Sequence, residues 1–281
     1  MKRKQLFEFE DQAWFPHWIR ECMTRYIVAV HSLLGTSKTL AKLVARAMEH
    51  STTHRIIDLC SGSGGPMLEV ADILRKHYGY PELTLTLSDL YPNQEAATKL
   101  NQDGNEHTEY LTQPVNAADL DKTLEGVRTM VCSLHHMPPK VAKGILKNAQ
   151  QSQQPICIYE ISDNSIPRGV RWLALPTTFI MVFFITPLIR PMTWQQLVFT
   201  YLIPILPLAI AWDGAVSNIR TYTLSDLDTL LADLQSEQYT WEKGTLEGKG
   251  GNKLYLLGLP LAKKTEANIS PENTEPTVAQ D

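Results

Sequence analysis

The hydrophobic residues of the chain follow two spacings that alternate through its middle part. Short apolar runs typical of buried strands occur at 55–59, 83–90, 129–134 and 155–162, with a weaker run near Pro114 and Val115. Segments with apolar residues three and four positions apart, as in amphipathic helices, lie between them at 66–79, 93–102 and 141–150. This alternation predicts a parallel sheet covered by helices on both faces.

The first fifty residues have mainly helical spacing. Residues 11–50 predict two helices, with Gly35 as the stop of the first and Ser37 as the N-cap of the second. Aromatic residues gather near the start of this region, at Trp14, Phe15, Trp18 and Tyr26. We expect an N-terminal helical cap whose aromatic group packs against the apolar block that follows the fifth strand, with a direct part in an acceptor pocket as the alternative.

The C-terminal part returns to the strand and helix pattern. Residues 225–235 predict a helix capped by Ser225, and 239–246 and 253–260 predict an antiparallel pair joined by a glycine-rich turn. With these two strands the expected fold is α/β, with a seven-stranded, mostly parallel sheet.

An apolar block interrupts this pattern between the fifth strand and the next helix. Arg190 is the only charged residue strictly between Trp172 and Trp212. A spanning helix needs about 20 apolar residues, and tryptophans favour the two interfaces of a bilayer. The half 172–189 is slightly short for this, whereas 191–212 is long enough. We favour an apolar helical hairpin that enters the membrane, with a lid over the active site or a homodimer interface as the alternatives.

Composition narrows the class of protein. The 281 residues suffice for one large core with an appendage, and 43% apolar against 20% charged residues is typical of a globular protein. A net charge of −4 gives no general attraction to nucleic acid, so we expect no nucleic-acid partner. The four cysteines are scattered without CxxC spacing, which favours a reducing compartment. Glu8, Glu10 and Asp11 stand where a signal peptide has its apolar core. We therefore expect the cytoplasmic side of the cell membrane.

A glycine-rich turn follows the first predicted strand, in the sequence DLCSGSGG from Asp58 to Gly65. Glycines let the backbone turn tightly and approach a ligand, and the next helix offers unpaired N–H groups there. The dinucleotide pattern GxGxxG needs glycine at position 67, where the chain has Met67. This argues against NAD or FAD.

The turn resembles the first motif of the class I S-adenosylmethionine-dependent methyltransferases, an acidic residue followed by GxG. Asp58, Gly62 and Gly64 match it, while Cys60 replaces a glycine that is frequent there. Asp89, at the end of the second strand, matches the acidic side chain that holds the ribose hydroxyls. The resemblance covers about 50–165 and 213–260, and it implies a Rossmann-like fold with S-adenosyl-L-methionine as cofactor.

The same resemblance implies the remaining cofactor contacts. Leu90 and Tyr91 match positions that flank the adenine, and Asn116 and Ala117 match the site that contacts its edge. The segment SLHHMPP resembles that of small-molecule methyltransferases rather than the motif of enzymes that methylate base or amide nitrogen. The full expected cofactor set is Asp58, Cys60, Ser61, Gly62, Gly64, Asp89, Leu90, Tyr91, Asn116, Ala117 and Ser133.

Three residues near this edge are candidates for catalysis. His135 and His136 can act as a general base for the acceptor, because imidazole titrates near neutral pH, or they can pack and cap the turn. Glu160, at the end of the fifth strand, either bonds the acceptor or caps the next segment. Arg220 either binds an acidic group or pairs with a surface carboxylate, which we favour. We expect no metal site, since the histidines lack ligand spacing.

These patterns divide the chain into five expected parts. They are the N-terminal helical cap 1–50, the cofactor-binding core 51–165, the insertion 166–212, the C-terminal part of the core 213–262 and a disordered tail 263–281. The expected function is methyl transfer from S-adenosylmethionine to a lipophilic or membrane-presented small molecule. A membrane-anchored protein that binds the cofactor without turnover is the alternative.

Overall fold

A computed structural model of the chain describes residues 1–261, apart from 104, 122, 166 and 168–170. Its strands are β1 (Arg55–Leu59), β2 (Thr84–Ser88), β3 (Thr108–Tyr110), β4 (Val127–Val131), β5 (Ile156–Glu160), β6 (Tyr239–Leu246) and β7 (Lys253–Pro260). Its longer helices are α1 (His17–Leu34), α2 (Thr36–Met48), α3 (Met67–His77), α4 (Gln94–Gln102), α5 (Pro139–Gln151), α6 (Ala174–Ile185), α8 (Ile205–Arg220) and α9 (Leu224–Leu231). The expected disordered tail at 263–281 lies outside the described residues.

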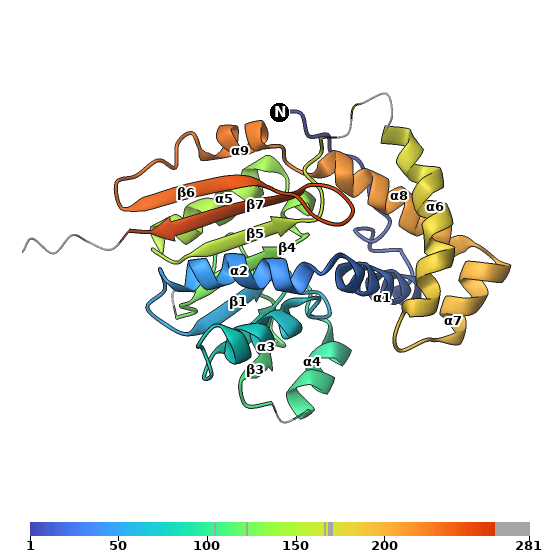
Figure 1. Cartoon of the computed structure of the whole chain (residues 1–281), viewed down its shortest axis with the longest axis horizontal. Coiled ribbons are helices and arrows are strands. Elements are labelled where there is room, and N and C mark those ends of the chain that lie inside the picture. The colour runs from blue at the N-terminus through green and yellow to red at the C-terminus, as the bar shows by residue number, and fades with distance from the viewer. Residues whose placement is uncertain (104, 122, 166, 168–170, 262–281) are drawn as a thin grey trace, which may run out of the picture.

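One seven-stranded sheet forms the centre of the molecule, in the order β3-β2-β1-β4-β5-β7-β6 (Figure 1). The pairings from β3 to β5 are parallel, whereas β7 runs antiparallel to both β5 and β6. The expected seven strands and the closing antiparallel pair are confirmed. The sheet is mixed, however, so "mostly parallel" describes only its β3 to β5 part.

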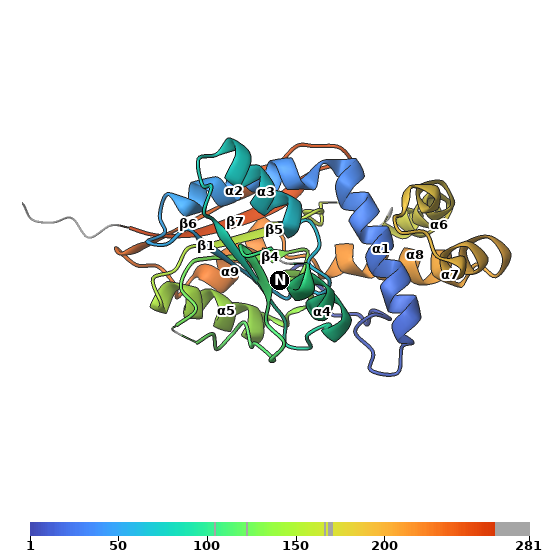
Figure 2. The same ribbon diagram turned by 90° about the horizontal axis from the view of Figure 1, so that it is seen from below.

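Helices cover both faces of this sheet, as the alternating pattern predicted. Figure 2 shows α2 and α3 on one face and α5 and α9 on the other. Two clusters of buried apolar side chains fill the spaces between these helices and the strands. Strands β1, β2 and β5 are buried on both faces, as is typical of parallel strands in a covered sheet, and the buried positions of β2 alternate between leucine and threonine or serine.

The third strand is not where the sequence placed it. It spans Thr108–Tyr110, where Thr108 and Tyr110 are buried on either side of the exposed Glu109. Pro114 has no N–H for a ladder, and Val115 lies in the following loop, where its backbone N–H donates to the carbonyl of Asp89 at 2.8 Å. The expected strand at 114–115 is therefore wrong. The strand lies earlier in the chain, at Thr108–Tyr110, and residues 114–115 belong to the loop that follows it.

The helix starts also differ from expectation, while the stop at Gly35 is confirmed. Gly35 is the left-handed C-cap of α1, and α2 begins at once with Thr36. The hydroxyl of Ser37 donates to Glu69 at 2.7 Å and so does not act as a cap. At α9 the cap is Thr223 rather than Ser225, because Thr223 forms a reciprocal capping box with Asp226.

The first sixteen residues are not helical and run along the carboxyl ends of the strands. The backbone N–H groups of Lys2 and Arg3 donate to Asp226 at 2.6 and 3.2 Å, and that of Phe9 donates to Asp213 at 2.7 Å. Residues 1–16, here called the N-terminal strap, therefore reach α8 and α9 from outside. The expected helical cap begins only at His17.

The apolar block folds as a group of short helices beside α1. After η2 (Arg171–Leu173) and α6 come η3 (Thr186–Leu188), α7 (Trp194–Leu197), the π-helix η4 (Val198–Leu202) and α8. Prolines at 187, 191 and 204 fall at the breaks between these pieces, because proline lacks the N–H that continues a helix. The expected halves 172–189 and 191–212 are thus not two continuous helices.

Side chains from the strap, α1, α6 and α8 close a separate small core between α1 and this block. Phe15, Cys22 and Tyr26 pack with Val182 and Leu206 in one buried cluster. The ring of Trp18 lies 4.5 Å from that of Phe199 between centroids. The expected packing of the N-terminal aromatic group against the block is confirmed for these residues, whereas Trp14 is 68% exposed.

Among the described residues, no one helix combines the length and the apolar composition that crossing a membrane requires. The segments Trp194–Leu202 and Ile205–Arg220 meet both conditions only when taken together, and they are bent by 85° at their junction.

Candidate functional site

The glycine turn after β1 has the backbone that its residues predict. Gly62 and Gly64 adopt φ values of 55° and 94°, in the left-handed region that favours glycine. A Cβ added to Gly64 would lie 3.2 Å from Leu87 Cδ1, a tight contact that adds to the backbone preference for glycine there. Cys60 has a φ of 59°, which explains why a glycine is favoured at this place.

Asp89 lies directly beside this turn. One carboxylate oxygen accepts a hydrogen bond from the Gly62 N–H at 3.0 Å, and the other accepts from the Tyr91 N–H at 2.9 Å. The carboxylate is only partly buried, whereas Leu90 and Tyr91 are 43% and 84% exposed. An acidic group with apolar neighbours thus faces the open edge of the sheet next to the glycines.

Asp58 has a different position, behind the turn rather than on its surface. Its side chain is buried and accepts a hydrogen bond from the Thr129 hydroxyl at 2.6 Å. Burial raises the pKa of this carboxyl to about 7, although the hydrogen bonds oppose the shift. Its backbone carbonyl accepts from the hydroxyls of Ser61 and Ser88 at 2.9 and 2.8 Å. Asp58 and Ser61 therefore hold the turn against β2 and β4.

The other expected cofactor residues lie in the loops after β3 and β4. The Val115–Asp89 backbone bond of 2.8 Å brings the first of these loops beside Asp89, with Asn116 exposed and Ala117 buried. Asn116 uses its side-chain oxygen to accept from the Ala118 N–H at 3.0 Å. Ser133, after β4, is buried, and its hydroxyl has no hydrogen-bond partner within the described chain.

His135 and Glu160 form a buried pair across the ends of β4 and β5. The Nδ1 atom of His135 lies 2.8 Å from one carboxylate oxygen of Glu160, and the backbone N–H of His135 donates to the other at 3.1 Å. Since an ionised carboxylate only accepts, Nδ1 carries the proton and a neutral ring keeps its lone pair on Nε2. Glu160 thus orients His135, which differs from both roles expected for Glu160, a bond to the acceptor or a cap on the next segment.

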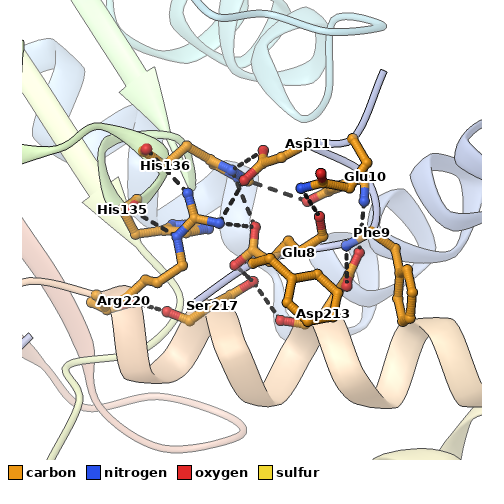
Figure 3. A network of polar contacts seen from close by, with 12 residues as sticks. Glu8, Phe9, Glu10, Asp11, His135, His136, Asp213, Ser217 and Arg220 are labelled. Carbon is orange, nitrogen blue, oxygen red and sulfur yellow. Dashed lines mark hydrogen bonds and ion pairs between the residues drawn. The ribbon is translucent and has the colours of Figure 1, made fainter. Parts of the chain in front are cut away.

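His136, the next residue, contacts the N-terminal strap. Its Nδ1 atom lies 2.9 Å from Asp11 Oδ1 and 3.1 Å from Glu8 Oε2, as Figure 3 shows. The rings of His135 and His136 are tilted neighbours with centroids 4.2 Å apart. His136 is therefore one of the points at which the strap is fixed to the core.

Arg220, at the end of α8, is the second such point. It is 1% exposed, and its Nη1 atom lies 3.0 Å from Glu8 Oε2 and 2.6 Å from Asp11 Oδ2. The same guanidinium donates to the backbone carbonyls of His135 and His136 at 3.3 and 3.1 Å. Arg220 is thus buried and joins the strap to the two histidines, and the favoured pairing with a surface carboxylate is observed at the exposed Asp11.

The carboxyl groups of the strap have opposite electrostatic environments. Burial raises the pKa of Glu8 to about 7, and the neighbouring positive charges of His136 and Arg220 only partly oppose this. Burial acts in the same direction on Asp11, but its hydrogen bonds and ion pairs with His136 and Arg220 outweigh it and hold its pKa well below the ordinary value.

Glu8, His135 and His136 also have the composition of a metal site. One potential ligand atom from each lies within 4.8 Å of the others. The positively charged guanidinium of Arg220, 3.0 Å from Glu8, already occupies the position next to this carboxylate and would repel a cation. We therefore interpret the group as an ion-pair network that fixes the strap.

Sequence reasoning did not identify Glu8 or Asp11 as part of the site. The signal was present in the spacing of FEFED, where acidic side chains alternate with large apolar ones. In the structure Phe9 belongs to an aromatic group with Phe15 and Trp212, while Glu8 is buried against Ser217 and Arg220. Nothing in the sequence, however, indicates that this segment reaches the ends of β4 and β5.

The observed edge of the sheet fits the nucleoside part of S-adenosylmethionine. Asp89 has an accessible carboxylate for ribose hydroxyls, Leu90 and Tyr91 offer exposed apolar surface for a base, and the turn at Gly62 leaves room for the ligand. Two hollows on the surface lie elsewhere, one along α4 and one near Arg55 and Glu109. Neither hollow lies at the glycine turn, so Asp89, Gly62 and their neighbours define the candidate site.

Comparison with known proteins gives similarity of structure only. No family model and no curated protein matches the chain. The chain is similar to the plantazolicin methyltransferase BpumL in complex with SAH, with 11% identity, a TM-score of 0.47 and coverage of 87% of this chain and 98% of that one.

Two further solved structures are longer than this chain. LaPhzM is 19% identical with a TM-score of 0.44, and human N-acetylserotonin methyltransferase in complex with SAM is 14% identical with a TM-score of 0.45. The matches cover 82% and 84% of this chain but only 57% and 55% of those proteins. At such low identities and TM-scores below 0.5, we infer function from the residues of the chain itself.

Proposed function

We propose that this protein is a methyltransferase that uses S-adenosyl-L-methionine. The observation that carries the proposal is the position of Asp89, whose partly exposed carboxylate lies 3.0 Å from the N–H of Gly62 in the glycine turn. In this arrangement Asp89 would hold the ribose hydroxyls, the glycine turn would lie along the cofactor, and Leu90 and Tyr91 would flank the base. When bound, S-adenosylmethionine supplies a methyl group that is already activated for transfer.

The protein's own contribution to catalysis is then to position the acceptor and to accept its proton. Aligned reactants can lower a barrier by up to about 7–11 kcal/mol. We assign the proton acceptor to His135, because Glu160 fixes its ring and leaves Nε2 as the basic atom. His136 is engaged by Asp11 and Glu8 of the strap, so we assign it a positioning role. A base is required only for an acceptor that loses a proton.

The acceptor that we propose is a lipophilic small molecule. The N-terminal strap and α8 both donate to the backbone carbonyl of His135, and α8 continues directly from the apolar block. Apolar surface beside a polar reacting centre favours a substrate that has an apolar part and a polar group at which it reacts.

The four cysteines of the chain are free thiols, which supports a protein working on the cytoplasmic side of a cell.

Two measurements test this proposal in sequence. Isothermal titration calorimetry with S-adenosylmethionine and S-adenosylhomocysteine measures cofactor binding, and we expect both to bind. Incubation of the protein with methyl-labelled cofactor and a native lipid extract, followed by mass spectrometry, then identifies the methylated product. Binding without any labelled product from lipid or polar extracts would favour the alternative of a cofactor-binding protein without turnover. No binding of either nucleoside would refute the proposal.

A further inference from the structure

The exposed apolar side chains of this protein are concentrated in one region. More than half of the exposed large apolar residues in the described chain lie between Trp172 and Leu208. We call the residues 172–208 the apolar lobe. Its exposed members are Trp172, Leu173, Ile180, Met181, Phe184, Leu188, Trp194, Leu197, Tyr201, Leu202, Ile203, Ile205 and Leu208. In Figures 1 and 2 this lobe projects from the end of the molecule, beyond α1.

Helix α6 carries apolar side chains on both its buried and its exposed side. Val182 and Ile185 are buried on its inner side. The outer side carries Ile180, Met181 and Phe184, which are 54%, 43% and 71% exposed. A helix on the surface of a water-soluble protein normally has polar residues on that side. A large contiguous apolar surface of this kind marks a contact with a partner or a membrane.

The charges and aromatic residues of the lobe favour lipid as that partner. Arg190 is its only charged residue and lies exposed at the turn between α6 and α7, where its guanidinium donates to the backbone carbonyls of Pro187 and Ile189 and forms no ion pair with a carboxylate of the described chain. The chain as a whole has a net charge of −4. A lobe with one cation and no acidic side chain is therefore complementary to lipid phosphates. Trp172 and Trp194 are 52% and 65% exposed, as expected of side chains at the headgroup level.

The short and bent helices of the lobe exclude a span across the bilayer. Helix α6 has 12 residues, so it is about 18 Å long, against about 30 Å for the hydrocarbon core of a bilayer. The segments Trp194–Leu202 and Ile205–Arg220 meet at 85° and cannot form a straight span. Short apolar helices with a charged turn are instead suited to one leaflet, where they can be buried by about 5–10 Å.

We propose that the apolar lobe inserts into one leaflet of a phospholipid bilayer without crossing it. The outer side chains of α6 and η4, with Leu197 of α7, would enter the acyl region, and Arg190, Trp172 and Trp194 would lie among the headgroups. A lipophilic molecule dissolved in that leaflet would then meet the protein beside α8, which ends at Arg220 and the two histidines. This consequence alone rests on the proposed function, whereas the docking itself does not.

Flotation with phospholipid vesicles tests the docking without cofactor or acceptor. The full chain is mixed with vesicles of phosphatidylcholine, or of phosphatidylcholine with phosphatidylglycerol, and floated on a density gradient. We expect the wild-type protein to float with both, and more strongly with the anionic vesicles. We expect F184E and L202E each to weaken the partition by about tenfold or more, because a charge must then enter the apolar layer. V141E, which changes a 38% exposed apolar residue of α5, is the matched control and should float as the wild type does.

Four results would overturn the proposal, three from flotation and light scattering and one from fluorescence quenching. The first is failure of the wild-type protein to float. The second is unchanged flotation of F184E and L202E while their thermal unfolding matches that of the wild type. The third is a wild-type dimer in light scattering that F184E dissociates while vesicles do not compete with it, since a second copy of the chain would then cover the lobe. Quenching of Trp194 fluorescence by lipids brominated near the headgroup should exceed quenching by lipids brominated near the chain end. The reverse order would contradict shallow insertion.

Discussion

Arg220 Nη1 lies 3.0 Å from Glu8 Oε2, although the two residues are far apart in the sequence, and both side chains are buried. The same guanidinium donates to the backbone carbonyls of His135 and His136. One side chain therefore fixes the N-terminal strap and the histidine turn to the end of α8. The geometry of the candidate catalytic residues depends on this contact.

Replacement of Arg220 is expected to destabilise the protein strongly. Arg220→Met leaves Glu8 and Asp11 without their main cation, and breaking a buried pair costs about 3–5 kcal/mol. Urea denaturation measures the loss. Arg46→Met is the matched control, because the Arg46–Glu242 pair is exposed and such pairs contribute about 0–1 kcal/mol. The double variant R220M/E8Q should recover part of the loss, and equal losses in both single arginine variants would contradict the assignment.

Glu8 is expected to make stability depend on pH in an unusual direction. Burial raises its pKa from 4.5 to about 7, so the folded protein holds the proton more tightly than the unfolded chain does. This contribution to stability is complete below about pH 4.5 and is lost as the pH rises through about 7. Glu8→Gln has no carboxyl group to titrate, so this variant lacks the pH-dependent contribution to stability. The difference in free energy of unfolding, wild type minus E8Q, should therefore fall by about 2–3 kcal/mol between pH 4.5 and pH 7.5. Parallel pH profiles would show that Glu8 titrates normally.

Asp89 is expected to determine the affinity for the cofactor. Asp89→Ala removes charge-assisted hydrogen bonds to the ribose, which costs about 2–3 kcal/mol or about 30- to 150-fold in affinity. Calorimetry with S-adenosylhomocysteine measures this directly. Asp72→Asn, in an exposed carboxylate of α3, is the control and should bind normally. Unchanged binding by D89A would place the ribose elsewhere.

His135 and Glu160 are expected to affect turnover rather than cofactor binding. His135→Gln should lower the rate of labelled methyl transfer by about a hundredfold to ten-thousandfold, as loss of a general base does. Glu160→Gln should reduce the rate less, because the amide oxygen can still accept from Nδ1. The ¹⁵N spectrum of His135 reports whether E160Q changes the tautomer, which a purely structural role of Glu160 would not require. Full activity of H135Q would mean that no base acts at this position.

Cys60 is expected to carry backbone strain. Its φ of 59° costs a residue with a Cβ about 1–2 kcal/mol, but glycine adopts it freely. We expect Cys60→Gly to be more stable than Cys60→Ala by about 1 kcal/mol in urea denaturation. Gly62→Ala, at a φ of 55° with open space around the added Cβ, should lose a similar amount through the backbone alone. A more stable alanine at position 60 would mean that the turn relaxes out of the left-handed region.

Local patterns predicted most of the sheet. The ranges 239–246 and 253–260 agree with β6 and β7, because long runs bounded by a glycine-rich turn fix both ends of a hairpin. The weak point was β3, which has only three residues, Thr108–Tyr110. A strand this short takes its stability from pairing with β2, and no local signal separates it from a loop.

The candidate cofactor site could be predicted because its residues lie at the ends of predicted strands. Asp58, Gly62 and Asp89 each follow or end a strand, and the carboxyl ends of parallel strands meet at one edge of the sheet. Their sequence positions therefore imply that they are neighbours. What the sequence did not predict is that Asp58 points behind the turn, because this depends on the hydroxyl of Thr129 in a strand 71 residues away.

The sequence by itself determined the order of strands and helices, the glycine turn and the apolar character of residues 172–212. These features depend on spacing and on backbone preferences that a few neighbouring residues decide. Only the tertiary structure decided that Glu8 meets Arg220 and that Glu160 orients His135. It also decided that the apolar block forms bent, short helices with an exposed outer side. Such contacts join segments that are distant in sequence, and their free energy depends on burial, which exists only after the chain has folded.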